Sequence, residues 1–274
     1  MTAPYRDLYI YYLRGRLGNC LTAEFSNFLG NWEEDEYSFL FFSSPSMDAV
    51  ESIVREQPEV SLIDHYRMSY EEWQGGPVVP LQVCGLTICP PWNADGTENS
   101  QRTIILDPGL VFGTGTHPTT RDCLEALELA MAEGAPDLAL DIGTGTGLLA
   151  LAAARYGCRR VIAVELNGLA ATTANRNIRL NRLHDRIMVV QGDAEKFMDL
   201  PVDLMISNIH YDVMRHLVVS KGFLREKHFI LSGLLRSEAR QISRELERIQ
   251  VSIIKTWQRD GVWHTFYGKT IPEC

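Results

Sequence analysis

The sequence predicts an α/β fold in which a seven-stranded, mostly parallel sheet ends in an antiparallel hairpin, preceded by a small α+β domain. Three observations support this prediction. From Thr119 onward, strand-like and helix-like segments alternate, which requires crossover connections and a sheet covered on both faces. Asp260-Gly261 separates the last two strands, and this dipeptide favours a tight hairpin turn. Before residue 70, short strands and helices are mixed without such alternation.

Size and composition set further limits. The 274 residues suffice for one large domain and a small one. A formal net charge of −9 argues against a nucleic-acid-binding surface and suits a cationic cofactor or a basic protein partner. The six cysteines include no Cys-x-x-Cys pair, so we expect reduced thiols and no metal site. With neither a leader nor an apolar run near ~18 residues, we expect a cytoplasmic protein that is not inserted in a membrane.

The first part of the chain predicts a small substrate-recognition domain and a linker. Its segments are a strand at Leu8–Leu13, a helix at Cys20–Leu29, a strand at Tyr37–Phe42, a helix from the cap Ser46 to Arg55, and a strand at Val60–Tyr66. After Gly75-Gly76-Pro77, strands at Leu81–Cys89 and Thr103–Leu106 flank a polar loop at Asn93–Ser100. We therefore divide the chain into residues 1–70, a linker with entry strands at 71–102, and a main domain at 103–274.

In the main domain, Thr119 and Asp122 resemble a capping box that opens a helix running to about Met131. The predicted strands are Leu138–Asp141, Arg160–Val164, Ile187–Val190, Val202–Ile206, His228–Ser232, Val251–Trp257 and Val262–Gly268. The predicted helices between them are Leu148–Tyr156, Leu169–Asn181, Tyr211–Val218 and Ser237–Ile249. Because ligands of such sheets bind at the carboxyl ends of the strands, the residues after each strand are candidates for a site.

The first strand of the main domain breaks into three alternate glycines, Gly143, Gly145 and Gly147. Glycines let a ligand approach bare backbone, and the helix that follows offers unpaired amides; a tight turn without a ligand is the alternative. A dinucleotide fingerprint has Gly-x-Gly-x-x-Gly, whereas Leu148 stands at that third glycine position, which disfavours hydride transfer. Asp141 beside the turn suits a cationic or amine-bearing ligand better than a pyrophosphate.

Polar residues also follow the next three strands. Glu165 is placed to accept hydrogen bonds from both hydroxyls of a ribose, or is a solvated surface charge. Asp193 is a candidate for an adenine amino group, or forms a turn. Asn208 has a carbonyl that accepts hydrogen bonds from an amine, which points to an amino acceptor. The alternative for Asn208 is an N-cap for the helix that begins near Tyr211.

Together, Asp141-x-Gly143-x-Gly145-x-Gly147, Glu165, Asn208 and the final hairpin resemble a class I S-adenosylmethionine-dependent methyltransferase. The run Leu106–Thr120 is similar to the signature of the enzymes that methylate protein eleven of the large ribosomal subunit. Ile88–Trp92 and Leu231–Leu235 are supporting matches. The resemblance implies a Rossmann-like methyltransferase sheet, S-adenosyl-L-methionine as cofactor, and a basic ribosomal protein as partner, without direct nucleic-acid binding.

The resemblance also implies that Thr120 contacts the cofactor and that the loop Phe112–Thr116 closes over it. The predicted cofactor-binding set is Phe112, Gly113, Thr114, Thr120, Asp141, Gly143, Gly145, Gly147, Glu165, Asp193 and Asn208. The catalytic candidates are Asn208, His210 and Tyr211. We interpret His117 as a loop-packing residue, and Trp263 as a residue of the acceptor cleft or of the core.

The predicted function is transfer of a methyl group to a lysine or N-terminal amine of a large-subunit ribosomal protein. One alternative is methylation of a glutamine side chain or a nucleic-acid amino group. Enzymes of that kind carry Asn-Pro-Pro-Tyr at this strand end, where Ile209-His210 replaces both prolines. The others are a catalytically silent relative that binds the cofactor and, more remotely, an NAD-dependent enzyme.

Overall fold

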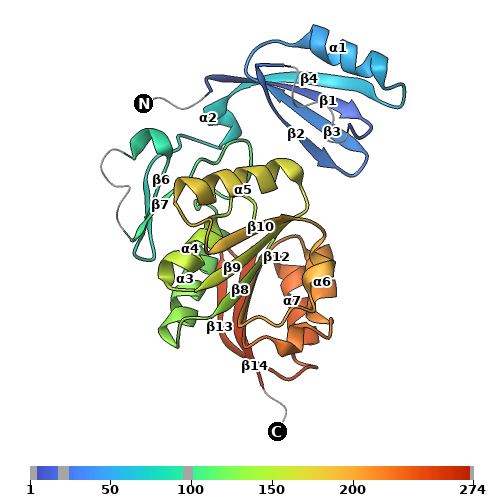
Figure 1. The fold of residues 1–274 in the computed structure, drawn as a ribbon. Helices are drawn as coiled ribbons and strands as arrows, with labels where there is room; N and C mark the ends of the chain where they lie inside the picture. Colours follow the sequence, from blue (N-terminus) through green and yellow to red (C-terminus); the bar gives the residue numbers. More distant parts are fainter. Residues whose placement is uncertain (1–4, 18–24, 95–100, 272–274) are drawn as a thin grey trace. The chain divides into compact units, whose positions relative to one another are not determined.

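The computed structural model describes residues 5–17, 25–94 and 101–271. The chain separates into two compact units, Met1–Val78 and Val79–Cys274 (Figure 1). The strands between residues 81 and 105 belong to the second unit. The domain boundaries at residues 70 and 102 stay a prediction.

The first unit contains a four-stranded antiparallel sheet in the order β2-β3-β1-β4. Its elements are β1 (Asp7–Arg14), β2 (Phe28–Glu34), β3 (Tyr37–Phe42), α1 (Met47–Glu56), β4 (Ser61–Ser69) and α2 (Tyr70–Trp73). Val50 and Ile53 of α1 form one buried cluster with Leu13, Leu40 and Phe42 of the sheet. One face of this sheet is therefore buried beneath a helix.

The predicted helix Cys20–Leu29 is wrong where the structure describes it. Residues 20–24 lie outside the described residues, and β2 begins at Phe28. Phe25 and Phe28, three positions apart as on one face of a helix, both contact the ring of Phe42, with centroids at 6.2 and 5.2 Å. They do so from a turn and from a strand paired with β3, so packing on the sheet overrides the helical spacing.

A second, three-stranded sheet opens the second unit. Its strands are β5 (Leu81–Val83), β6 (Leu86–Cys89) and β7 (Thr103–Ile105), in that order. The prediction of one strand over Leu81–Cys89 is wrong, because Cys84 and Gly85 have φ values of 48° and 67° and reverse the chain. In the predicted loop Asn93–Ser100, residues 95–100 lie outside the described residues, and Asn93 ends the short helix η2 (Pro91–Asn93).

The main sheet has seven strands in the order β10-β9-β8-β11-β12-β14-β13. From residue 118 the elements are α3 (Pro118–Ala132), β8 (Leu138–Ile142), α4 (Leu148–Tyr156), β9 (Arg160–Glu165), α5 (Gly168–Leu180), β10 (Ile187–Gln191), η3 (Ala194–Phe197), β11 (Leu204–Asn208), α6 (Tyr211–Val218), η4 (Phe223–Arg225), β12 (His228–Leu235), α7 (Arg236–Leu246), β13 (Val251–Arg259) and β14 (Trp263–Thr270). Strands β8 to β12 pair in parallel, and β14 pairs antiparallel with β12 and β13.

Helices cover both faces of the main sheet (Figure 1). Side chains of α3, α4 and α5 join one buried cluster, and those of α6 and α7 join the other. This is the α/β fold that the sequence predicts, with a seven-stranded main sheet and a small N-terminal unit. Within the described residues, no helix is long and apolar enough to cross a membrane.

The predicted capping box of Thr119 and Asp122 is wrong. The N-cap of α3 is His117, whose Nδ1 accepts from the Thr119 amide, and Pro118 takes the first helical position, where its missing N–H costs no bond. Asp122 is fully buried and accepts a hydrogen bond from Arg259 of β13 at 2.7 Å. Its carboxylate thus ties the helix to the hairpin and is not available as a cap.

Glu226, between η4 and β12, is a buried carboxyl group. The residue is 1% exposed, and neither carboxyl oxygen has a hydrogen-bond partner among the described residues. Burial raises the pKa of Glu226 to about 9. The folded state therefore holds this proton to a higher pH than the unfolded chain, where glutamate has a pKa of about 4.3.

We predict that Glu226→Gln flattens the pH dependence of stability. In the wild type, the free energy of unfolding should fall as the pH rises from about 5 toward 9, because the unfolded state releases this proton first. The variant lacks that loss, so its Tm should exceed the wild-type value most at high pH. Calorimetric scans across this range test it, with the exposed Glu128→Gln as control; parallel profiles for wild type and Glu226→Gln would contradict it.

Candidate active site

The strand order places the predicted site residues at one edge of the main sheet. Strand β8 lies between β9 and β11, so the chain proceeds to one side of β8 and later returns to the other. In such sheets, the crevice outside the carboxyl ends at this switch point is the usual ligand site. The glycine turn follows β8, and Glu165 and Asn208 end the two flanking strands.

The glycine turn adopts a backbone that side chains would block. Gly143, Gly145 and Gly147 have φ values of 69°, 57° and 85°, in the left-handed region. A Cβ on Gly143 would lie 2.3 Å from Ile209 Cγ2, and one on Gly145 would lie 3.0 Å from the carbonyl oxygen of Phe112. The turn is therefore bordered by the residue after Asn208 and by the predicted covering loop.

Asp141 holds the base of this turn. It is 1% exposed, and Oδ2 accepts hydrogen bonds from the Thr144 hydroxyl at 2.6 Å and the Ala150 amide at 3.1 Å. Oδ1 is buried without a partner among the described residues. Burial, opposed by those two bonds, raises the pKa of Asp141 to about 7, with a smaller contribution from the Glu165 charge. An unsatisfied buried acceptor of this kind calls for a further hydrogen-bond donor.

Glu165 ends β9, and Asp193 follows β10. Oε2 of Glu165 accepts from the Gly145 amide at 3.0 Å and Oε1 from the Asn167 amide at 3.0 Å, which fixes the carboxylate against the glycine turn. Each oxygen keeps a further lone pair for a hydroxyl. Asp193 is the N-cap of η3 and accepts from the Glu195 amide at 3.0 Å, which agrees with a turn-forming role.

Two buried asparagines, Asn177 of α5 and Asn181 at its C-cap, hold the segment that leads to the covering loop. Asn177 accepts from the Asp107 amide and donates to the Asp107 carbonyl, both at 2.9 Å. One turn later, Asn181 accepts from the Ile105 amide at 2.9 Å and donates to the Ile105 carbonyl at 2.6 Å. The two carboxamides thus bond the backbone amides and carbonyls of Ile105 and Asp107, which a neighbouring strand would otherwise pair.

The same helix links the covering loop to the glycine turn. Asn177 also donates to the carbonyl of Thr146 at 2.9 Å, and the Thr146 hydroxyl donates to the carbonyl of Gly113 at 2.7 Å. Arg176 adds an ion pair with the buried carboxylate of Asp107 at 3.0 Å. Backbone on both sides of the predicted cofactor position is therefore fixed by one element.

Three rings continue the covering loop toward the hairpin. Phe112, 65% exposed, lies 5.4 Å from the ring of His117, which lies 4.9 Å from Trp263, both edge to face. Nδ1 of His117 contacts the Thr119 hydroxyl at 2.7 Å, and burial lowers the pKa of His117, so its imidazole is neutral near pH 7.

The two threonines of the predicted cofactor-binding set lie in different surroundings. Thr120 is buried in α3, and the Thr114 hydroxyl bonds to that of Thr116 at 2.8 Å.

On the acceptor side, Asn208 ends β11, the strand beside β8, and the next residue, Ile209, borders Gly143 of the glycine turn. A Cβ on Gly233 of β12 would lie 3.1 Å from Oδ1 of Asn208, so the absence of a side chain there leaves room for this amide. His210, and not Asn208, is the N-cap of α6, and it pairs with Asp212 at 3.4 Å. The Tyr211 hydroxyl donates to Gln241 of α7 at 2.6 Å.

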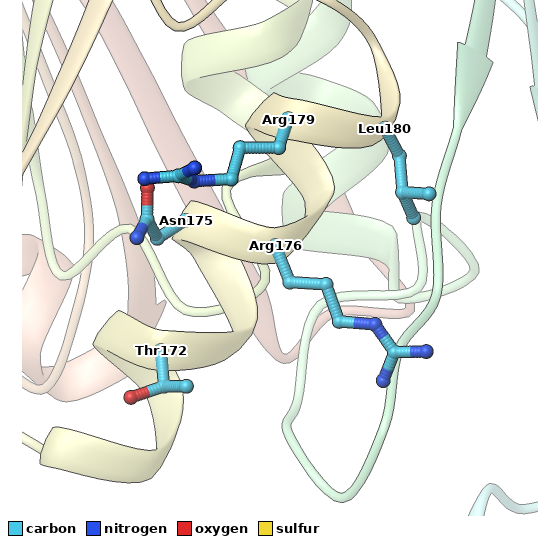
Figure 2. A pocket seen from close by; sticks show the side chains of 5 residues that line it. All are labelled: Thr172, Asn175, Arg176, Arg179 and Leu180. Atoms are coloured by element: carbon cyan, nitrogen blue, oxygen red, sulfur yellow. The ribbon is translucent and has the colours of Figure 1, made fainter.

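A shallow hollow lies on the outer face of α5, away from these residues (Figure 2). It is lined by Thr172, Asn175, Arg176, Arg179 and Leu180. None of them belongs to the predicted site, whereas the opposite face of α5 carries Ala174 against Gly147 and Asn177 against Thr146. Residues of one helix thus separate into a solvent-facing set and a set that shapes the glycine turn.

Sequence reasoning missed Asn177, Asn181, Thr146 and Gly233. A signal for the asparagines exists, because both fall on the apolar face of the predicted helix Leu169–Asn181, where polar side chains need a partner. The described residues contain no cluster of three metal-ligating side chains, and their four cysteines, Cys84, Cys89, Cys123 and Cys158, are free.

Comparison with known proteins identifies the family. Residues 54–270 match the family model described as "Ribosomal protein L11 methyltransferase (PrmA)". The chain belongs to this family. Its members are class I methyltransferases that use S-adenosyl-L-methionine, and the glycine turn, the carboxylate at the end of β9 and the unpaired buried acceptor on Asp141 fit that cofactor.

Individual relatives support the family assignment. The chain is 36% identical over 186 residues to a ribosomal protein L11 methyltransferase of Anoxybacillus flavithermus, covering 67% of this chain and 59% of the relative. The chain is also 37% identical over 187 residues to a ribosomal protein L11 methyltransferase of Thermosynechococcus vestitus. This match covers 64% of this chain and 60% of the relative. The chain thus spans less than two thirds of these relatives' length.

A solved structure agrees in fold over a similar part of the chain. The crystal structure of the ribosomal protein L11 methylase from Lactobacillus delbrueckii subsp. bulgaricus superposes with a TM-score of 0.61 and 27% sequence identity. The superposition covers 70% of this chain and 98% of that one. The family assignment therefore agrees with the fold as well as with the sequence.

Asn177 provides a direct test of the link between α5 and the two loops. Asn177→Ala removes three hydrogen bonds and leaves buried backbone groups of Asp107 and Thr146 unpaired, so we predict a loss of about 2–4 kcal/mol in the free energy of unfolding. Asn175→Ala, exposed on the same helix, should cost about 0.5 kcal/mol or less. Urea unfolding of both variants measures this, and equal losses would refute the assigned role.

Proposed function

We propose that this chain transfers a methyl group from S-adenosyl-L-methionine to an amino group, of a lysine or of the N-terminus, on ribosomal protein L11. The observation that carries the proposal is that Asn208, an acceptor of amine hydrogen bonds, ends the strand beside β8, whose glycine turn fits the cofactor. The names of the relatives, which are ribosomal protein L11 methyltransferases, support this acceptor protein. Ribosomal proteins are made in the cytoplasm, so we place the reaction there.

In this proposal the cofactor is held from three sides. Glu165 accepts the hydroxyls of its ribose, and Oδ1 of Asp141 accepts from its amino group. Phe112, Gly113 and Thr114 cover it, while Asp193 and Thr120 contact it at the margins. When bound, S-adenosyl-L-methionine supplies an electrophilic methyl group whose transfer leaves a neutral thioether. Alignment and exclusion of water are then the main contributions of the protein.

The acceptor amine must be neutral before it can react. A lysine with a reference pKa of about 10.4 loses its proton at pH 7 at a cost of about 4–5 kcal/mol. Burial lowers that cost because it disfavours the ammonium form. The side-chain carbonyl of Asn208 and the main-chain carbonyls beside it accept the remaining N–H bonds and orient the lone pair. His210 and Tyr211, at the start of α6, line the approach of the acceptor.

The acceptor assay tests the function. The chain is incubated with methyl-labelled S-adenosyl-L-methionine and, separately, with ribosomal protein L11, a glutamine-containing protein acceptor, and ribosomal RNA. We expect label on amino groups of ribosomal protein L11, located by mass spectrometry. Label on the glutamine or on RNA, or no label on any acceptor, would overturn the proposal.

The Asp141 carboxyl group predicts a pH dependence of cofactor binding. Its pKa of about 7 means that it is largely protonated below that pH, and a cationic amine prefers the carboxylate. The Kd of S-adenosyl-L-methionine should therefore fall as the pH rises, by up to about tenfold per unit below pH 7. Asp141→Asn should bind more weakly and without this slope. Calorimetric titrations near pH 6 and pH 8 measure it; the same slope in both proteins would speak against the assignment.

Asn208 is predicted to act on the acceptor more than on the cofactor. Asn208→Ala should lower kcat for methylation by about 100-fold or more, since positioned groups contribute on this scale, while the Kd of the cofactor changes by about 5-fold or less. His210→Ala, an exposed neighbour, should keep most of the rate. Unchanged turnover with unchanged cofactor binding in Asn208→Ala would sink this role.

A further inference from the structure

The arginines of the second unit are concentrated in one segment of the chain. Residues 155–186 contain seven arginines, no lysine and two acidic residues, a net charge of +5 in a chain whose net charge is −9. The net charge argues against a nucleic-acid-binding surface only as an average over the chain, and this segment departs from that average. The seven residues, here called the arginine patch, are Arg155, Arg159, Arg160, Arg176, Arg179, Arg182 and Arg186.

The fold gathers the arginine patch at one edge of the main sheet, where α4 and α5 end and β9 and β10 begin. Arg155 of α4 donates to the carbonyl of Asn181, the C-cap of α5, at 3.4 Å. Arg186 donates to the carbonyls of Ala154 and Cys158 at 2.9 and 2.5 Å. Because β8, β9 and β10 are parallel, this edge holds their amino ends, whereas the glycine turn follows the carboxyl end of β8. The patch and the candidate active site therefore lie at opposite edges of the sheet.

Most of the charge of the arginine patch is not neutralised. Among the described residues, only two of its arginines pair with a carboxylate: Arg159 with Asp137 at 3.6 Å, and Arg176 with Asp107 at 3.0 Å. The other five guanidinium groups bond backbone carbonyls or are exposed. Like charges held together repel one another, and an anion bound across them would remove that repulsion.

The arginine patch has a fixed base and an exposed rim. Arg155 and Arg186 are half-buried, and burial, followed by the nearby charge of Arg186, lowers the pKa of Arg155. Both remain cations at pH 7, because the reference pKa of a guanidinium is above 12. Arg160, Arg179 and Arg182 are exposed and free of ion pairs within the described part of the chain, so they are available to a partner.

The chemistry of the arginine patch selects a phosphate-rich partner. A guanidinium donates two parallel hydrogen bonds to one phosphate, and every cation of the patch is an arginine. An anionic membrane fits less well, because a helix at a membrane surface needs a wide apolar face toward the lipid. Of the residues that line the hollow on the outer face of α5, only Leu180 is apolar (Figure 2). A nucleic acid needs only cations placed against its backbone phosphates.

We propose that the arginine patch binds RNA through its phosphate backbone, with Arg160, Arg179 and Arg182 as the phosphate contacts. The choice of RNA rests on the proposed function, in which the protein substrate is a ribosomal protein. The phosphate chemistry rests on the arginines alone. RNA bound at the amino ends of the strands leaves the site at the carboxyl ends open to the cofactor and the acceptor.

Binding measurements on the full chain test the proposal. The probe is a fluorescently labelled poly-uridine RNA followed by anisotropy; the comparison probes are a labelled poly-glutamate peptide and, by co-sedimentation, vesicles that contain phosphatidylserine. We expect the RNA alone to bind. With three to five phosphates neutralised, its association constant should fall by about 20- to 130-fold between about 50 and 200 mM salt. Binding of the peptide or of the vesicles as tightly as the RNA, or of no probe, would overturn the proposal.

A matched pair of charge variants separates the arginine patch from the overall charge. Arg179→Gln with Arg182→Gln removes two exposed charges of the patch, whereas Arg240→Gln with Arg244→Gln removes two exposed charges from α7, on the other face of the sheet. The first pair should weaken RNA binding by about 10-fold or more and flatten its salt dependence, and the second should weaken it by about 2-fold or less. Equal effects would refute the assigned surface.

The two proposals fail separately. A chain that binds RNA through the arginine patch but methylates no amino group refutes the proposed function and leaves the RNA surface in place. A chain that methylates ribosomal protein L11 but does not bind the RNA refutes the RNA surface alone.

Discussion

The carboxamide of Asn177 is the interaction on which the site depends. It is fully buried, and it joins the backbone before the covering loop to the backbone of the glycine turn through Asp107 and Thr146. Glycines let a ligand approach the backbone closely, but they lose more conformational entropy on folding than other residues do. Hydrogen bonds from other elements are therefore needed to hold the turn in one conformation. Helix α5 supplies those bonds, and Asp141 supplies others from below. The turn and its covering loop therefore form one pre-organised unit.

Charge is divided between the two units in a way that suits different tasks. The first unit carries nearly all of the net negative charge of the chain. In the second unit, the carboxylates that matter are few and buried, such as Asp141 and Asp122. Burial lets a single carboxylate favour a cationic ligand strongly, whereas many exposed carboxylates favour a cationic surface weakly and over a wider area.

The sequence predicted the parts of the molecule in which pattern and packing agree. The alternation after Thr119, the family, and the positions of Gly143, Glu165 and Asn208 at strand ends follow from local periodicity and from the parallel sheet. It failed where distant contacts decide. Phe28 pairs with β3 and is not helical, and Asp122 of α3 binds Arg259 of the hairpin. Asn177 lies on the apolar face of a predicted helix, which signals a buried polar contact, but its role could not be predicted because its partners, Asp107 and Thr146, lie 70 and 31 residues away.

Calorimetric titration of the unmodified full chain with S-adenosyl-L-methionine and, separately, with NAD tests the central claim that this pre-organised turn is a methyl-donor site. The account predicts saturable binding of S-adenosyl-L-methionine at one site per chain and no heat from NAD. Binding of NAD in place of S-adenosyl-L-methionine, or of neither, would contradict it.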